Sequence, residues 1–399
     1  MEGECIHIRR LTEGSMSYGN FYWEFIKTNT PVIVTGVSIK WECSNWLLKH
    51  GQENNIYSSE INFDYLKQQI GDRLVVVTKC STHDESTVSV EMQFHEFLNY
   101  WRNQILSSKA DVNNVTAPKI LYLKDWHLKA QLPNYEFYKV PQYFASDWLN
   151  EYLEEHKLDD YRFVYMGPKN SWTPLHIDVF GSYSWSTNIY GRKKWILLPP
   201  GEQFKLLGPR GSLPCNIKEE MLIEKSVNFL IIYQHENETL FVPSGWYHQV
   251  LNVTDTISVN HNWFNGTNIK YIWCNITENL RKVMNEILEF RQYVNFKEDC
   301  QQILKCNFGL NISDFLEILC FIANSRLTLY MKRYRSKDMS GNRKSVNSHP
   351  DNFHIHYDLK SINMLSKFIA QDKIVFNCST LYDRCMNLID ITQEIFLER

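Results

Sequence analysis

The stretch Thr-Pro-Leu-His-Ile-Asp-Val-Phe-Gly occupies residues 173–181 of a 399-residue chain. It predicts a strand, in which side chains two residues apart point to the same face. His176 and Asp178 are therefore expected to share one face, while Ile177 and Val179 point to the other. An imidazole and a carboxylate on the inner face of a strand are either a hydrogen-bonded pair or two ligands of a metal ion.

A third ligand for such a metal lies in the stretch Val-Pro-Ser-Gly-Trp-Tyr-His at 242–248. Pro243 and Gly245 predict a turn, and residues 246–250 predict a new strand that leaves it. His248, delivered from that strand, would complete a set of two histidines and one carboxylate. Such a facial triad is typical of non-haem Fe(II) oxygenases and leaves three coordination positions open. Two of them can take a bidentate 2-oxo acid, and the third can take O2.

A lysine pair supports this interpretation. The stretch Gly-Arg-Lys-Lys-Trp at 191–195 ends one strand-like segment and opens the next. A lysine that points from here into a barrel is a costly unpaired charge unless an anion meets it. The distal carboxylate of 2-oxoglutarate is a suitable anion. Taken alone, a His-x-Asp pair arises often by chance, and a capped or salt-bridged histidine is the alternative to a metal ligand.

The composition is that of a globular protein, with 44% hydrophobic residues and a net charge of −3. This charge offers no basic surplus for direct nucleic-acid binding. The first residues lack the apolar stretch of a signal peptide, and no run of 18 apolar residues predicts a membrane span. The ten cysteines form no C-x-x-C pair, which is typical of reduced thiols inside cells. We expect a cytoplasmic protein; a nuclear location is also compatible with these features.

Three regions are predicted along the chain. Residues 1–117 form a mixed α/β region that packs on a barrel, residues 118–282 form the barrel itself, and residues 283–399 are helical. Many short strands in a helix-poor block are typical of a barrel or jelly roll. The strands predicted in this block are 119–123, 162–166, 194–198, 228–233, 239–242 and 257–263.

Further elements are predicted around the barrel. Strands are expected at 31–36 and 73–78, followed by a one-faced helix over 94–105. Ser146 is expected to be the N-cap of a helix that interrupts the barrel. The polar residues 336–352 predict a loop in the helical region.

Taken together, these motifs resemble the JmjC family of 2-oxoglutarate oxygenases. They occur in that family's order and with its gaps: Thr-Pro-Leu-His-Ile-Asp at 173–178, Gly-Arg-Lys-Lys-Trp at 191–195, Leu-Pro-Pro-Gly at 198–201 and Pro-Ser-Gly-Trp-Tyr-His at 243–248. The resemblance covers residues 118–282. It implies a mostly β core, a double-stranded β-helix or cupin-like jelly roll, with flanking helices and a helical C-terminal region. Residues 179–188 are most similar to the subfamily that hydroxylates a lysine of the eukaryotic translation release factor.

The resemblance also implies cofactors and roles. Fe(II), 2-oxoglutarate and O2 would be required, with ascorbate as a supporting reductant. His176, Asp178 and His248 would ligate the iron. The residues implied to hold 2-oxoglutarate are Lys193 (with Lys194 as the adjacent alternative), Thr173 and Tyr122 at its distal carboxylate, and Asn262 and Ser186 near its metal-bound end. Ser186 stands where several relatives carry an asparagine, and Asn260 shares the expected face of Asn262.

Simpler roles compete for several of these residues. Thr173 and Tyr122 could be an ordinary strand threonine and a half-buried core tyrosine. A second same-face pair, His354 and His356 with Asp358, follows the polar loop, where a surface or packing role is favoured. The tryptophans expected in the barrel core, in preference to a substrate cage, are Trp185, Trp195, Trp246 and Trp263.

Three functions of different classes remain open. The first is a protein-lysine hydroxylase whose partner is the release factor and whose activity supports translation termination. The second is a histone N-methyl-lysine demethylase, although the chain has no cysteine-rich reader module and no basic tract. The third is a non-catalytic, cupin-like binding protein. The sequence predicts neither the oligomeric state nor the role of residues 283–399.

Overall fold

The computed structural model describes residues 8–51, 57–80, 88–109, 120–209, 211–337, 352–373 and 378–397. Most of the polar loop predicted at 336–352 lies outside these residues. The chain divides into two compact units that interleave in sequence: residues 1–143, 159–178 and 183–262 form the first, and the remaining residues form the second. The predicted region boundaries at 117 and 282 remain predictions.

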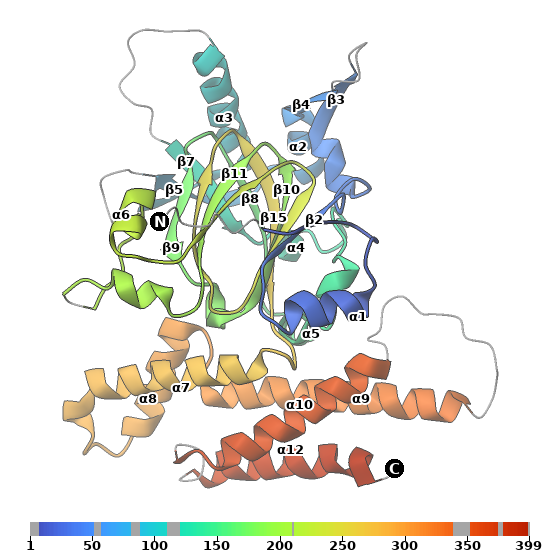
Figure 1. The fold of residues 1–399 in the computed structure, drawn as a ribbon, viewed down its shortest axis with the longest axis vertical. Coiled ribbons are helices and arrows are strands. Elements are labelled where there is room, and N and C mark those ends of the chain that lie inside the picture. Colours follow the sequence, from blue (N-terminus) through green and yellow to red (C-terminus); the bar gives the residue numbers. More distant parts are fainter. Residues whose placement is uncertain are drawn as a thin grey trace. The chain divides into compact units, whose positions relative to one another are not determined.

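The first unit is built on two facing β-sheets (Figure 1). The larger has nine strands, in the order β1 (Arg10–Thr12), β2 (Val32–Thr35), β13 (Glu238–Val242), β10 (Tyr183–Tyr190), β15 (Thr256–Trp263), β8 (Arg162–Gly167), β7 (Ile120–Trp126), β5 (Leu74–Cys80) and β6 (Val88–Gln93). The smaller has four strands, in the order β12 (Leu230–Gln234), β11 (Lys193–Leu198), β14 (Tyr247–Asn252) and β9 (Trp172–His176). The six strands predicted between 118 and 265 are therefore confirmed, with ends shifted by a few residues.

Shorter elements flank these sheets. A separate hairpin pairs β3 (Leu47–Gly51) with β4 (Tyr57–Ile61). The predicted one-faced helix is α3, which buries Phe94, Phe97 and Trp101. The helices of the first unit are α1 (Tyr18–Phe21), α2 (Phe63–Ile70), α3 (Phe94–Lys109), α4 (Leu128–Gln131) and α6 (Glu219–Glu224).

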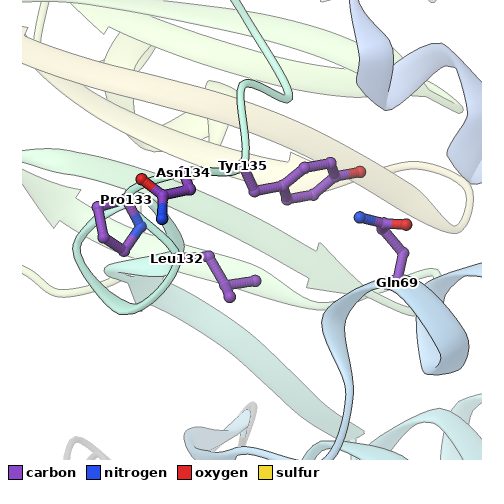
Figure 2. A pocket seen from close by; sticks show the side chains of 5 residues that line it. All are labelled: Gln69, Leu132, Pro133, Asn134 and Tyr135. Atoms are coloured by element: carbon purple, nitrogen blue, oxygen red, sulfur yellow. The ribbon is translucent and has the colours of Figure 1, made fainter.

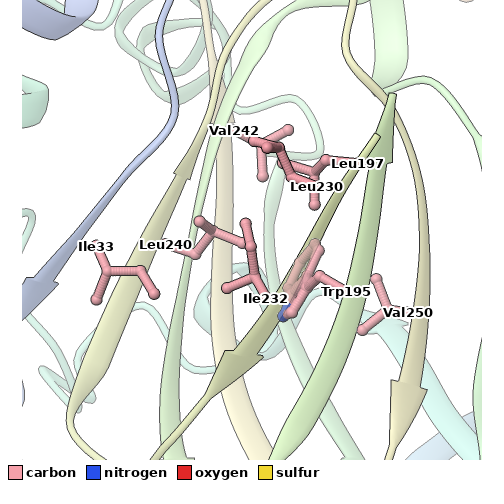
Figure 3. Packing of buried hydrophobic residues seen from close by; sticks show 8 residues of the cluster. All are labelled: Ile33, Trp195, Leu197, Leu230, Ile232, Leu240, Val242 and Val250. Carbon is pink, nitrogen blue, oxygen red and sulfur yellow. The ribbon is translucent and has the colours of Figure 1, made fainter. Parts of the chain in front are cut away.

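A hydrophobic core fills the space between the two sheets at one end (Figure 3). Its members come from alternate positions of strands in both sheets, so each strand turns one side of its pleat to the core. The cluster comprises Ile33, Trp195, Leu197, Leu230, Ile232, Leu240, Val242 and Val250. Full burial of such side chains stabilises the fold by about 1.5–3 kcal/mol each. This core fixes the register of the strands, and with it the face to which the polar side chains of the same strands point.

Strand β11 shows the consequence of that alternation. Trp195 and Leu197 point into the core between the sheets, and Lys193 lies on the same side of the strand. Ile196 and Leu198 pack into a second cluster on the other face of the small sheet, beside α6. The inner face of the strand therefore ends in a buried cation.

The second unit is helical. Its helices are α5 (Trp148–Glu155), α7 (Ile269–Glu286), α8 (Phe296–Phe308), α9 (Ile312–Lys337), α10 (Asn352–Ala370) and α12 (Ser379–Leu397), most of them drawn in orange to red in Figure 1. Among the described residues, no single helix is long and apolar enough to cross a membrane. Only α8 with the first part of α9, bent by 71°, passes that test as a pair. The fold class, a mostly β core with flanking helices and a helical C-terminal region, is confirmed.

One buried ion-pair network organises this unit, and it overturns the predicted helix cap. Arg326 is 1% exposed, donates to both carboxylate oxygens of Glu151 at 2.7 and 2.8 Å, and donates to Asp358 at 2.8 Å. Ser146 also donates to Asp358, at 2.8 Å, and has a left-handed backbone with φ of 60°. The Ser146 hydroxyl therefore bonds a residue of α10 and does not cap α5. The N-cap of α5 is Asp147, whose carboxylate accepts from the backbone N–H of Asn150.

Candidate metal centre and cosubstrate site

The three predicted metal ligands meet at one end of the space between the sheets. His176 on β9 lies directly opposite His248 on β14, and the centres of their rings are 4.2 Å apart. His176, Asp178 and His248 each offer a ligand atom, and these atoms lie within 4.8 Å of one another. Within the described residues, this is the group of histidines and carboxylates whose geometry suits a metal ion.

Backbone hydrogen bonds orient both imidazoles. Nδ1 of His176 lies 2.8 Å from the carbonyl oxygen of Pro174, and Nδ1 of His248 lies 3.1 Å from that of Trp246. A carbonyl oxygen can only accept, so Nδ1 carries the proton in each ring and Nε2 keeps its lone pair. Burial, together with the neighbouring His248, lowers the pKa of His176 to about 4. The ring is therefore neutral at pH 7, as a metal ligand must be.

Asp178 does not lie in the strand that the sequence predicts. Strand β9 ends at His176, and Asp178 lies in the bend before a 3-10 turn at Val179–Gly181. The chain turns sharply here, because Phe180 and Gly181 have φ values of 61° and 70°. The expected strand alternation is therefore wrong, although Asp178 still reaches the two histidines. Ser184 on β10 holds it there by donating to Oδ2 at 2.6 Å.

Lys193 is a buried cation, and no carboxylate among the residues that the structure describes pairs with it. Its side chain is 2% exposed, and its Nζ lies 3.4 Å from the hydroxyl of Tyr122. It also lies 6.0 and 5.8 Å from the ring centres of Tyr122 and Tyr165. Burial lowers the pKa of Lys193 to about 7. An anion bound here would remove this penalty, and a carboxylate of 2-oxoglutarate has the right charge.

Lys194, the alternative considered from the sequence, points to the other face of the strand. There it forms an ion pair with Glu219 on α6. Two successive residues of a strand face opposite sides, so only Lys193 reaches the space that contains the histidines.

The hydroxyls of Tyr122 and Thr173 lie beside Lys193. Burial raises the pKa of Tyr122, and hydrogen bonds from Asn252 and Thr173 to its hydroxyl oppose the rise. Thr173 pairs with Val250, and a bulge before His176 places Thr173 on the same face as that ligand, three residues away. Strict alternation would place the two side chains on opposite faces.

Two further residues beside Lys193 and Tyr122 were not identified from the sequence. Asn252 is 1% exposed, lies opposite Lys193 across the small sheet, and donates to the hydroxyl of Ser171 at 2.7 Å. Gly167 faces Tyr122, where a Cβ atom would come within 2.5 Å of the ring. Only a glycine leaves room for the tyrosine here. Neither residue belongs to a motif that the sequence analysis uses.

The polar residues predicted near the metal-bound end of 2-oxoglutarate lie on the large sheet. Ser186 on β10 donates to Oδ1 of Asn260 on β15 at 2.9 Å. Asn262 is 5% exposed and lies two positions further along β15, on the same face. The shorter Ser186 side chain is thus tied to Asn260, a contact that the sequence left open.

The competing residues lie elsewhere or belong to the core. Trp185, Trp195 and Trp263 are at most 3% exposed, as expected for barrel core, and Trp246 is partly buried. His354, His356 and Asp358 lie on helix α10 of the second unit, where residues two apart do not share a face. His354 and Asp358 are buried there, which is the packing role that the sequence favoured.

A hollow lies at the surface of the first unit, away from the predicted site residues (Figure 2). It is lined by Gln69 from α2 and by residues 132–135 after α4. None of these residues is a predicted site residue, and the polar groups it offers are side-chain amides and one tyrosine. The lining therefore includes no histidine, carboxylate or thiol of the kind that a metal site uses.

Comparison with known proteins now identifies the family. Residues 163–263 match the model described as "JmjC domain, hydroxylase". A protein of Drosophila melanogaster named "2-oxoglutarate and iron-dependent oxygenase JMJD4 homolog" is 47% identical over 392 residues, covering 94% of this chain and 91% of that protein. The chain belongs to the JMJD4 family. It is therefore a 2-oxoglutarate and iron-dependent oxygenase, which confirms the prediction of iron and 2-oxoglutarate.

Two other relatives mark the breadth of this similarity. Human JMJD4, "2-oxoglutarate and iron-dependent oxygenase JMJD4", is 35% identical over 340 residues, covering 82% of this chain and 78% of that protein. "Arginine-specific demethylase JMJ20" of Arabidopsis thaliana is 32% identical over 420 residues, covering 98% of this chain and 82% of that protein. The similarity to JMJD4 and its relatives thus extends well beyond the JmjC domain, into both compact units.

Proposed function

We propose that this chain is a protein hydroxylase that oxidises a lysine carbon of the eukaryotic translation release factor in the cytoplasm, and so supports translation termination. The observation that carries the reaction is the joint placement of two imidazoles, one carboxylate and one buried lysine that no carboxylate of the described residues pairs with, between the same two sheets. The lysine substrate rests on the resemblance of residues 179–188 to the subfamily of release factor lysyl hydroxylases.

Each residue has a defined task in this proposal. His176, Asp178 and His248 would hold Fe(II), with Ser184 fixing the carboxylate and backbone carbonyls fixing both rings. Lys193, Thr173 and Tyr122 would bind the distal carboxylate of 2-oxoglutarate. Asn262 and Ser186 would line its metal-bound end. When bound, iron with 2-oxoglutarate and O2 supplies oxidative decarboxylation to succinate and CO2, coupled to insertion of one oxygen atom into a substrate C–H bond.

Mass spectrometry of recombinant release factor tests this function. The factor is incubated with the protein, Fe(II), 2-oxoglutarate and ascorbate, and His176→Ala is the control variant. One added oxygen on a single lysine, absent in the control, would support the proposal. Succinate formation without any added oxygen would discard the release factor as substrate and keep the oxygenase.

A demethylase is the second candidate, because the Arabidopsis relative is named an arginine-specific demethylase. The same iron chemistry on an N-methyl group releases formaldehyde. Formaldehyde from methylated arginine or lysine peptides, in the absence of release factor hydroxylation, would favour this alternative.

A further inference from the structure

A β-bulge beside the candidate site redirects one acidic side chain. Strand β7 pairs with β8 so that Leu123 lies opposite Met166 and Trp126 lies opposite Val164, which leaves one extra residue on β7. Asp125 lies in this bulge and has a left-handed backbone with φ of 55°. Such bulges aim side chains where regular pairing cannot, often next to active sites. Here the bulge brings the Asp125 carboxylate to the hydroxyl of Tyr165, at 2.5 Å.

Tyr165 connects this carboxylate with the candidate site. It lies opposite Ser258 on the inner face of the large sheet, with its ring centre 5.8 Å from Nζ of Lys193. Burial and the charge of Asp125 raise the pKa of Tyr165, and Asp178 contributes in the same direction. The predicted iron ligand Asp178 is therefore within electrostatic range of the Tyr165 hydroxyl.

The Asp125 carboxylate is accessible to solvent. Half of its side-chain surface is exposed. Burial raises the pKa of Asp125. The charge of Lys124 and the hydrogen bonds from Lys124 and Tyr165 lower this pKa and outweigh burial, and the charge of His176 also lowers it. The pKa thus lies below its ordinary value, and the carboxylate is ionised at neutral pH.

The hydrogen bonds to Asp125 leave acceptor capacity. Nζ of Lys124 lies 2.7 Å from Oδ2, and the Tyr165 hydroxyl occupies one position on Oδ1. A carboxylate accepts about four hydrogen bonds, so about two positions remain for a further donor. Lys124 balances part of the charge while no other cation is present.

Three aromatic residues form a row on the face of β8 to which Tyr165 belongs. Phe163 and Tyr165 occupy alternate positions of β8 with ring centres 6.4 Å apart, and Tyr161, just before the strand, lies 6.2 Å from Phe163. Aromatic faces suit aliphatic chains and attract cations. A row of aromatic rings that ends at an ionised carboxylate suits a ligand with a long aliphatic side chain and a cationic end.

We propose that Asp125, held in place by Tyr165, binds the terminal ammonium of the substrate side chain and so selects a lysine. This inference rests on the proposed function and adds the group that recognises the substrate. Asp125 would touch the substrate, whereas Tyr165 is a positioning residue that fixes the carboxylate across the bulge.

Binding of two small probes tests the inference. The protein is loaded anaerobically with Fe(II) and 2-oxoglutarate, and its affinity for Nα-acetyl-lysine methylamide is compared with that for the norleucine analogue, which lacks the ammonium. We expect wild type to prefer the lysine derivative at least tenfold. Asp125→Asn should bind both alike, and asparagine tolerates the left-handed backbone of this position. Tyr165→Phe, which keeps the ring, should lose part of the preference.

A matched control removes a carboxylate elsewhere. Asp64 is 88% exposed on its side chain and accepts from Arg102 at 2.7 Å, so Asp64→Asn also deletes a charge paired with a basic group. This variant should keep the wild-type preference. A preference that survives in Asp125→Asn, or that wild type does not have, would overturn the inference.

The same variants separate this inference from the proposed function. If wild type hydroxylates the release factor and Asp125→Asn does so with unchanged KM and kcat, the inference fails while the function stands. If wild type leaves the release factor unmodified but shows the Asp125-dependent preference for the lysine probe, the named substrate fails while the recognition site stands.

Discussion

Replacement of Lys193 by methionine should stabilise the cofactor-free protein and strongly weaken 2-oxoglutarate binding. In the folded protein, burial lowers the pKa of Lys193 from an ordinary value of 10.5 to about 7. The unfolded chain therefore binds more protons than the folded one between these values, so stability rises with pH across this range. Methionine has a similar length, carries no charge and fills irregular space well.

The two pKa values set the size of the effect. Linkage gives a cost of about 4 kcal/mol for the buried lysine at pH 7, which falls to about 2 kcal/mol at pH 9. Lys193→Met should remove this cost, so its advantage over wild type should be largest near or below pH 7 and should shrink as the pH rises towards 10.5. Without the cation, 2-oxoglutarate should bind at least about 100-fold more weakly, as expected when one partner of a buried charge pair is removed.

Urea denaturation of the metal-free proteins at pH 7 and pH 9 measures the first effect, and calorimetric titration of 2-oxoglutarate measures the second. Lys194→Met is the control, since it deletes a partly exposed ion pair with Glu219 and should change stability by less than about 1 kcal/mol. A Lys193→Met variant that is no more stable than wild type at pH 7, or that still binds 2-oxoglutarate normally, would be inconsistent with a buried cation at Lys193 that binds 2-oxoglutarate.

Three further predictions concern other parts of the molecule. The dissociation constant of 2-oxoglutarate should rise with pH above about 7, approaching tenfold per pH unit, because only protonated Lys193 pairs with the carboxylate; calorimetry at pH 6.5, 7.5 and 8.5 checks this, and a flat profile contradicts it. Ser184→Ala removes the hydroxyl that orients Asp178 and should weaken Fe(II) binding by about 10–100-fold; competition with a chelator measures it, and unchanged affinity would show that the bond has no role. Arg326→Met leaves the buried Asp358 and the partly exposed Glu151 without their cation and should cost about 3–5 kcal/mol; thermal unfolding should show the loss, and an unaltered transition would argue against the network.

Sequence reasoning succeeded where local periodicity or side-chain chemistry carries the signal. Short apolar runs between turn residues predicted most strands of the two sheets, although not β1 and β6. The residue types of His176, Asp178 and His248 limited the chemistry before their distances were known. The lysine pair at 193–194 was of interest because a buried cation needs an anion; the family resemblance pointed to Lys193, and the structure buries it.

Irregular backbone explains what the sequence could not predict. The bulge between Thr173 and His176 and the bulge at Asp125 each insert one residue, which reverses the face of every later side chain. No periodic pattern marks such an insertion. Asp178 likewise leaves the strand because the chain turns after it.

Long-range partners were also out of reach. Ser146 was expected to cap a helix, since serine is a common N-cap residue. Its hydroxyl instead bonds Asp358, 212 positions away in the sequence. The sequence gives no sign of the role of Asn252 either, because that role comes from its position opposite Lys193 on the neighbouring strand.

Anaerobic titration with Fe(II) and 2-oxoglutarate, followed by optical absorption, shows whether both bind between the two sheets. We expect a charge-transfer band that saturates at one iron and one 2-oxoglutarate per chain. His248→Ala should lack the band, and Lys193→Met should require far more 2-oxoglutarate to develop it. A band of wild-type strength and affinity in both variants would show that iron and 2-oxoglutarate bind elsewhere.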